Sequence, residues 1–131
     1  MKRMGERYME KWIAVGLGGA LGAIGRYSIS LLPVKTSFPW LTLITNLLGA
    51  FLIGCIVGIS TEKAWPETWT LFWKTGVCGG FTTFSTFSLE AWNLLENGKT
   101  IQGGAYILLS VLLCLLGVGL GRALGRRLGR V

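Results

Sequence analysis

The sequence predicts an all-α integral membrane protein with four transmembrane helices and a break in the third. Three observations lead to this prediction. Hydrophobic residues make up 51% of the 131 residues and charged residues only 15%, whereas a soluble domain carries about 25% charged residues. The apolar residues fall in long blocks, each with at least the ~20 residues that cross ~30 Å of hydrocarbon. A cluster of Gly, Thr and Ser interrupts the third block.

The first predicted span covers about residues 12–32, and the second covers about residues 40–59. The first is too long for the hydrophobic core of a signal peptide, and no small-residue cleavage site follows it. A short loop at 33–39 separates the two spans, and a polar loop at 60–68 leads on to the third.

The third predicted span, about residues 69–95, is unusually long and contains "GGFTTFSTFS" at 79–88. The two glycines and the threonines that follow them disfavour a regular helix. In lipid, a broken helix is tolerated only where protein buries it or where it lines a watery cavity. We therefore predict a break inside this span, followed by a fourth span at about 101–121.

Basic residues account for a net charge of +7 and gather in two flanks, 1–11 and 122–131. Basic flanks on apolar spans indicate a surface that faces anionic lipid, and no nucleic-acid-binding motif accompanies the charge. Four spans place both termini on one side, and the opposite loops offer only Lys35 and Lys99. The positive-inside rule thus predicts cytoplasmic termini. With 131 residues, enough for one domain, we expect a single multi-pass domain over 1–131 in the inner (plasma) membrane.

The chain lacks the residues that most enzymes and metal sites need. It has no His and no Asp, and its acids are six Glu. Its three cysteines, Cys55, Cys78 and Cys114, are isolated, which is typical of small buried hydrophobes rather than of a disulfide framework. We therefore expect a protein that is not an enzyme.

Glycines recur at four-residue spacing in the first, second and fourth spans. Such stripes let helix backbones approach closely in lipid, within one chain or between chains. Four thin, glycine-rich helices can enclose very little space, so a pathway between them would need a second copy of the chain. We therefore favour an oligomer. The residues concerned are Gly18, Gly22, Gly54, Gly58, Gly117, Gly121, Gly125 and Gly129.

A few polar side chains lie inside the spans. Arg26 either concentrates anions or reaches the membrane interface as an anchor. Thr42 and Asn46 share one helical face, where the amide N–H groups suit an anion or join neighbouring helices. Tyr106 and Ser110 begin a thin polar track on the fourth span, which Cys114 continues as a weaker donor.

The interrupted segment carries further chemistry. Carbonyls freed at a helix break can coordinate a cation. Phe81, Phe84 and Phe87 recur every three residues. The edge of an aromatic ring is positive and can face an anion, although most Phe side chains simply fill the core. We expect Phe81 to be packed.

Four segments together resemble the Fluc (CrcB) family of fluoride channels. They lie in all four predicted spans, and the third is highly specific. The segments are "GGALGAIGRY" at 18–27, "TLITNLLGAFLIG" at 42–54, "GGFTTFSTFSLE" at 79–90 and "YILLS" at 106–110.

The resemblance implies an antiparallel (inverted) dimer of four-span subunits with two fluoride pores at its interface. It also implies a structural sodium ion at the dimer centre, held by the main-chain carbonyls of Gly79 and Thr82. Such a channel exports cytoplasmic fluoride passively, with the membrane potential helping to drive the anion out.

The resemblance also implies a fluoride pathway. Its pore residues are Asn46, Phe84 and Phe87. Arg26 corresponds to a vestibule arginine, and Glu90 to the acid that closes the motif. The remaining members are the hydroxyls of Thr42, Thr83, Tyr106 and Ser110. Relatives often carry a hydroxyl residue where this chain has Cys114.

Three alternatives stay open. The strong charge bias is unusual for a subunit inserted both ways, so a heterodimer with an inverted paralogous subunit competes with the homodimer. A small four-span antiporter of the multidrug type would need an intramembrane carboxylate, for which Glu90 is the candidate. In an assembly factor without transport, the polar residues would serve packing alone.

Overall fold

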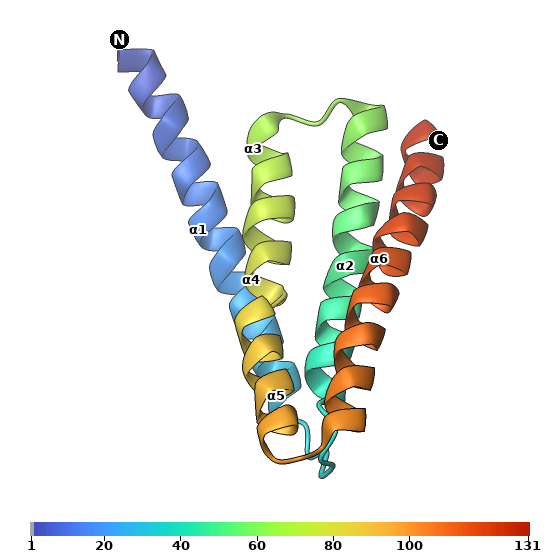
Figure 1. Ribbon diagram of the computed structural model, residues 1–131. Coiled ribbons are helices and arrows are strands. Elements are labelled where there is room, and N and C mark those ends of the chain that lie inside the picture. Colours follow the sequence, from blue (N-terminus) through green and yellow to red (C-terminus); the bar gives the residue numbers. More distant parts are fainter. Residues whose placement is uncertain (1) are drawn as a thin grey trace.

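The computed structural model describes residues 2–131, with side chains from residue 5 onward. Met1 and the side chains of residues 2–4, which open the predicted basic flank, lie outside the described residues. All regular structure in the described part is helical (Figure 1). The elements are α1 (Lys2–Ser30), α2 (Trp40–Lys63), α3 (Glu67–Thr70), the π-helix η1 (Leu71–Cys78), α4 (Gly79–Phe81), α5 (Phe84–Glu96) and α6 (Thr100–Arg130).

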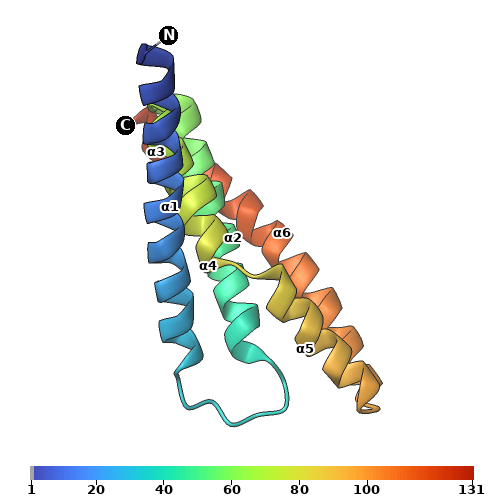
Figure 2. The same ribbon diagram turned by 90° about the vertical axis from the view of Figure 1, so that its left-hand side faces the viewer.

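Three long helices extend beyond the predicted spans. Helix α1 begins at Lys2 rather than near residue 12, α2 ends at Lys63 rather than near 59, and α6 continues from the predicted end near 121 to Arg130. Lys and Arg are good helix formers, so a helix does not end where its apolar block ends. The predicted basic flanks are thus largely helical, and both termini lie at the same end of the molecule (Figures 1 and 2).

Two helices, α2 and α6, are long and apolar enough to cross a membrane by length and composition. Only 17% of the apolar window of α6 is buried within the chain, and the exposed large hydrophobic residues of α6 are mostly Leu. An apolar outer surface of this kind suits a lipid surrounding. The count of four spans stays a prediction, because α1 and the interrupted third segment do not pass the same test.

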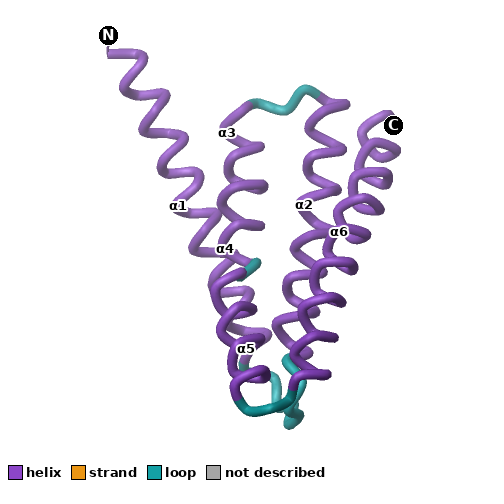
Figure 3. Tube along the Cα trace, in the orientation of Figure 1, coloured by secondary structure: helices purple, strands orange, loops and turns teal. Residues whose placement is uncertain are grey.

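The predicted break in the third segment is confirmed. Thr82 has φ −80° and ψ 157°, and Thr83 has φ −148° and ψ 110°, so both are extended, whereas helix resumes at Phe84. Gly79 and Gly80 are themselves helical, so the interruption follows the glycines instead of including them. The break redirects the chain: α4 packs on α1, and α5 packs on α6 (Figures 2 and 3).

Glycines let α1 lie directly on the segment that leads to the break. A Cβ added at Gly18 or Gly22 would collide with backbone atoms of Phe72 or Val77. One added at Gly80 would collide with the backbone of Gly19. The first predicted glycine stripe therefore serves packing within the chain.

The glycine stripes of the second and fourth predicted spans face each other between α2 and α6. A Cβ at Gly54 or Gly58 would meet the backbone of α6. One at Gly121 or Gly125 would meet the backbone of Phe51 or Cys55 on α2. The predicted close approach of backbones is confirmed for this helix pair.

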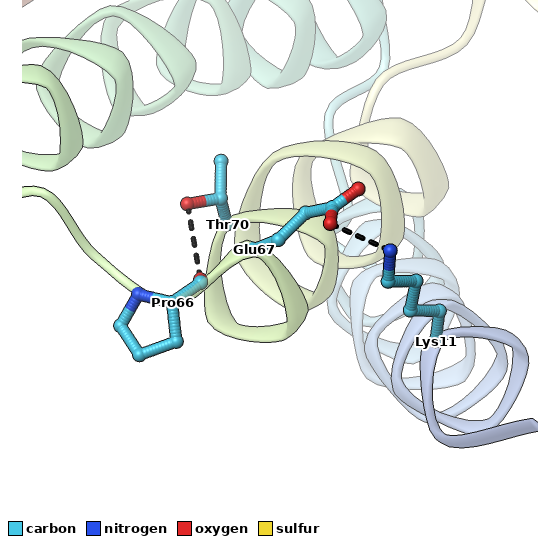
Figure 4. A network of polar contacts seen from close by, with 4 residues as sticks. All are labelled: Lys11, Pro66, Glu67 and Thr70. Atoms are coloured by element: carbon cyan, nitrogen blue, oxygen red, sulfur yellow. Dashed lines mark hydrogen bonds and ion pairs between the residues drawn. The ribbon is translucent and has the colours of Figure 1, made fainter. Parts of the chain in front are cut away.

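Helix α1 and α3 are also joined at the end where the termini lie. The Lys11 ammonium contacts the Glu67 carboxylate at 2.6 Å, and the Thr70 hydroxyl donates to the Pro66 carbonyl (Figure 4). The side chains of Lys11 and Glu67 are 30% and 69% exposed. An ion pair so open to its surroundings contributes little to stability, so close helix packing dominates here.

Candidate functional site

The break in the third segment is held by Asn46 of α2. The Asn46 Nδ2 donates to the Thr83 carbonyl at 3.1 Å, and its Oδ1 accepts from the Thr83 N–H at 2.8 Å. Buried main-chain groups need partners, and these two have left the helical ladder. One amide side chain therefore satisfies both groups and keeps a second N–H on Nδ2.

The threonines at the break end one helix and begin the next. The Thr82 hydroxyl donates to the Cys78 carbonyl at 2.9 Å. The Thr83 Oγ1 accepts from the Thr86 N–H at 3.2 Å and so caps α5, and it also donates to the Thr86 hydroxyl at 3.0 Å. A threonine cap of this kind satisfies one of the free N–H groups at a helix start.

The capping pattern leaves two carbonyls without their helical donors. The Thr83 N–H, which would bond the Gly79 carbonyl in a continuous helix, goes to Asn46. The Thr86 N–H, which would bond the Thr82 carbonyl, goes to the Thr83 side chain. Neutral carbonyl oxygens are ligands for hard cations. The Gly79 and Thr82 carbonyls predicted to hold sodium thus fit that task.

A cavity of about 290 Å³ lies beside the break and gathers residues from α2, α5 and α6. It brings together most of the predicted pathway. Its lining is Asn46, Ala50, Thr82, Thr83, Phe84, Phe87, Ser110, Val111 and Cys114. Cys114 lies one helical turn beyond Ser110, so these two residues of the predicted polar track line the cavity, whereas Tyr106 does not.

Ser110 brings an unused hydroxyl to this cavity. Its side chain is 94% buried, and its Oγ has no hydrogen-bond partner within the described residues. A buried hydroxyl without a partner costs about 1–3 kcal/mol, so such groups are rare and call for an explanation. A ligand that accepts a hydrogen bond would remove the cost.

Two of the three predicted phenylalanines line the same cavity. The Phe84 and Phe87 ring centroids lie 5.5 Å apart with a 44° angle between the planes, and Phe87 lies 5.1 Å from the Tyr106 ring. Phe84 is 79% exposed, far more than a core aromatic residue. Phe81 instead lies against Gly25 and Gly49 and is packed between α1 and α2, as expected.

Glu90 is placed outside this cavity and ties three helices together. Its Oε1 accepts from the Thr42 hydroxyl and its Oε2 from the Tyr106 hydroxyl, each at 2.8 Å. Tyr106 is fully buried and belongs to a small core with Leu43 and Leu94. Glu90 also lines a cavity of about 590 Å³ at the end of the molecule opposite the termini. The carboxylate is therefore fixed at both oxygens.

Arg26 is not brought together with Asn46 and the phenylalanines. Its Nε donates to the Gly80 carbonyl at 3.3 Å, close to the end of α4. It lines a separate cavity of about 50 Å³ with Thr42 and Thr83. Arg26 is half-buried. Its guanidinium contacts the end of α4, just before the break, where it stabilises the Gly80 carbonyl.

Sequence reasoning missed three features of the site. Asn46 forms two hydrogen bonds with the main chain of Thr83, 37 residues away, and no local pattern predicts such a contact. Ala50 and Val111 line the main cavity because of helix packing alone. Thr86 offered a usable signal, since a hydroxyl three residues after a capping Thr is placed to meet it.

Comparisons with known proteins identify the family of this chain. The family model described as "CrcB-like protein, Camphor Resistance (CrcB)" matches residues 13–122. The fluoride-specific ion channel FluC of Hahella chejuensis is 49% identical over 111 residues, which cover 81% of this chain and 87% of that protein. The FluC of Ruminiclostridium cellulolyticum is also 49% identical, over 81% and 85% of the two chains. The FluC of Methanococcus maripaludis is 46% identical over 82% and 88%.

Proposed function

Because the chain belongs to the CrcB-like protein family, we propose that it is a fluoride channel through which the anion leaves the cytoplasm passively. The proposal rests first on its relatives, which are fluoride-specific ion channels and not enzymes. On this proposal, the chain crosses the inner (plasma) membrane four times, with its basic termini in the cytoplasm.

One observation carries the proposal: the cavity at the break offers hydrogen-bond donors without a full charge. The unpartnered Ser110 hydroxyl and the second N–H of Asn46 are such donors. The rings of Phe84 and Phe87 add positive edges. Fluoride is small and strongly hydrated, so its water must be replaced by good donors, and a narrow passage refuses larger halides.

The pathway is completed, on this proposal, by a second copy in antiparallel orientation. Phe84 lines the cavity yet is 79% exposed in the single chain, which leaves one wall of the pathway open. A central sodium ion held by Gly79 and Thr82 carbonyls of both copies would offset the cost of anions in low dielectric. The partner is a second copy of this chain or, given the strong charge bias, an inverted paralogous subunit.

A flux assay in liposomes tests the channel. Purified protein in vesicles loaded with fluoride and chloride should release fluoride without a proton gradient and retain chloride. Equal chloride release, or release only under a proton gradient, would overturn the proposal. An antiporter coupled through Glu90 would show the second outcome, but the Glu90 carboxylate already accepts two hydrogen bonds from fixed partners, which disfavours it.

Phe84→Ile should lower fluoride flux about tenfold. The substitution removes an aromatic ring that lines the cavity, and the aliphatic side chain that replaces it has no positive ring edge to offer an anion. Folding should be little affected, because the side chain is largely exposed. The measurement is the initial rate of fluoride release per dimer, with a fluoride electrode.

Leu89→Ile is the matched control for Phe84→Ile. Leu89 lies on the same helix, is 62% exposed and does not line the cavity. The fluoride flux through the Leu89→Ile variant should therefore equal that through the parent. Parental flux in the Phe84 variant would remove Phe84 from the pathway. Equal losses in both variants would point to damaged assembly instead.

A further inference from the structure

The third segment presents an unusual surface before the break. Between Leu71 and Thr83 the exposed residues are Lys74, Thr75 and Gly79. None of them is a large apolar residue, whereas the exposed residues of α6 include Leu112, Leu115 and Leu116. A face of a membrane helix that is polar or small is suited to protein or water, and not to lipid tails. We call these three residues the polar strip.

Lys74 is the one charged residue of the polar strip, and it forms no ion pair with a carboxylate of the described residues. The ion pairs among the described residues are those of Lys11 with Glu67 and Arg130 with Glu62. An unpaired ammonium inside an apolar segment is costly and usually faces a watery cavity. Lys74 also lies within η1, and π-helical segments frequently occur at functional sites.

The polar strip continues to the proposed centre of the dimer. It runs from Lys74, inside η1, to Gly79, whose carbonyl is a proposed sodium ligand. In a parallel pair, two Lys74 ammonium groups would meet across the interface and repel each other. In an antiparallel pair, they lie on opposite sides of the centre, one in each approach to the pathway.

We propose that Lys74 lines the aqueous approach to the pathway on the side of its own termini and concentrates fluoride there. The proposal rests on the fluoride channel proposed above. It makes Lys74 an attracting residue for the anion, separate from the donors of the cavity at the break. A fixed positive charge beside a low-dielectric mouth raises the local concentration of anions, and salt weakens the effect.

The test compares Lys74→Met with Lys74→Arg in liposomes over a range of fluoride concentrations. At low fluoride and low ionic strength, Lys74→Met should release fluoride roughly threefold to fivefold more slowly, the scale of one unit charge acting through a few ångströms of water. At saturating fluoride or at high ionic strength, the two variants should agree. Lys74→Arg should behave as the parent throughout.

Lys63→Met is the matched control, because Lys63 is an exposed lysine at the end of α2 and carries the same charge change. An equal loss in this control would reduce the effect to general surface charge and overturn the role of Lys74. A loss that persists at high salt, or no loss at low salt while the parent conducts, would also overturn it. A parent that releases no fluoride would instead refute the proposed channel. Should Lys74→Met fail to assemble, Lys74→Gln is measured in its place with the same criteria.

Discussion

Asn46→Asp is expected to lower fluoride flux about a thousandfold. The carboxylate would still accept the Thr83 N–H, but it would place a second oxygen against the Thr83 carbonyl where Nδ2 now donates. It would also put a negative charge into the cavity that is proposed to receive an anion. Two unit charges about 4 Å apart repel by about 4 kcal/mol at the effective dielectric constant of a protein surface. The measurement is fluoride release from liposomes at equal protein content.

Asn93→Asp provides the comparison for this variant. Asn93 is exposed on α5 and lines the cavity at the far end instead of the one at the break. The same chemical change there should leave flux within about twofold of the parent, since exposed charges are well screened. Parental flux in the Asn46 variant would show that the amide neither holds the break nor touches the anion.

Gly121→Ala is expected to destabilise the protein by about 3 kcal/mol. The added methyl group would overlap the Phe51 carbonyl on α2, and a backbone atom cannot move aside without separating the two helices. Overpacking at such a contact typically costs about 1–3 kcal/mol and occasionally more. The measurement is the midpoint of unfolding in detergent, followed by the fluorescence of the six tryptophans.

Gly119→Ala separates this clash from the general effect of alanine. Gly119 lies on the same helix, and a Cβ there would meet nothing within 4 Å. Alanine is the better helix former by about 1 kcal/mol, so this variant should be as stable as the parent or slightly more stable. A Gly121 variant that gains stability in the same way would contradict the close contact between α2 and α6.

The sequence predicted the architecture well where physical constraints are local. The Thr82–Thr83 pair cannot be mistaken for ordinary membrane helix, because β-branched hydroxyl residues after two glycines disfavour it. The stripe containing Gly121 and Gly125 indicates close backbone contact, because only glycine lacks the Cβ atom that would prevent it. Both features follow from the residue itself, and the structure confirms both.

What the sequence did not predict depends on distant partners. Hydropathy did not show that α6 continues beyond residue 121 to Arg130, because hydropathy reports the surroundings of a residue and not its helicity. The hydrogen bond from Arg26 to the Gly80 carbonyl joins two different helices, so no local pattern predicts it, and the vestibule role of Arg26 stays a prediction. The fixed state of Glu90 likewise needs Thr42 and Tyr106 from two other helices.

The hold of Asn46 on Thr83 also has a consequence for biosynthesis. Asn46 precedes Thr83 by 37 residues, so the ribosome delivers the amide before the threonine whose main chain it binds. On the proposed membrane topology, segments that insert in the order of synthesis would bring α2 into place before the interrupted segment, so the freed N–H and C=O would meet their partner on arrival. A chain with its second and third segments in the opposite order would expose those groups to hydrocarbon until the amide arrived. The order of the helices along the chain would thus supply the partner before the main-chain groups that need it.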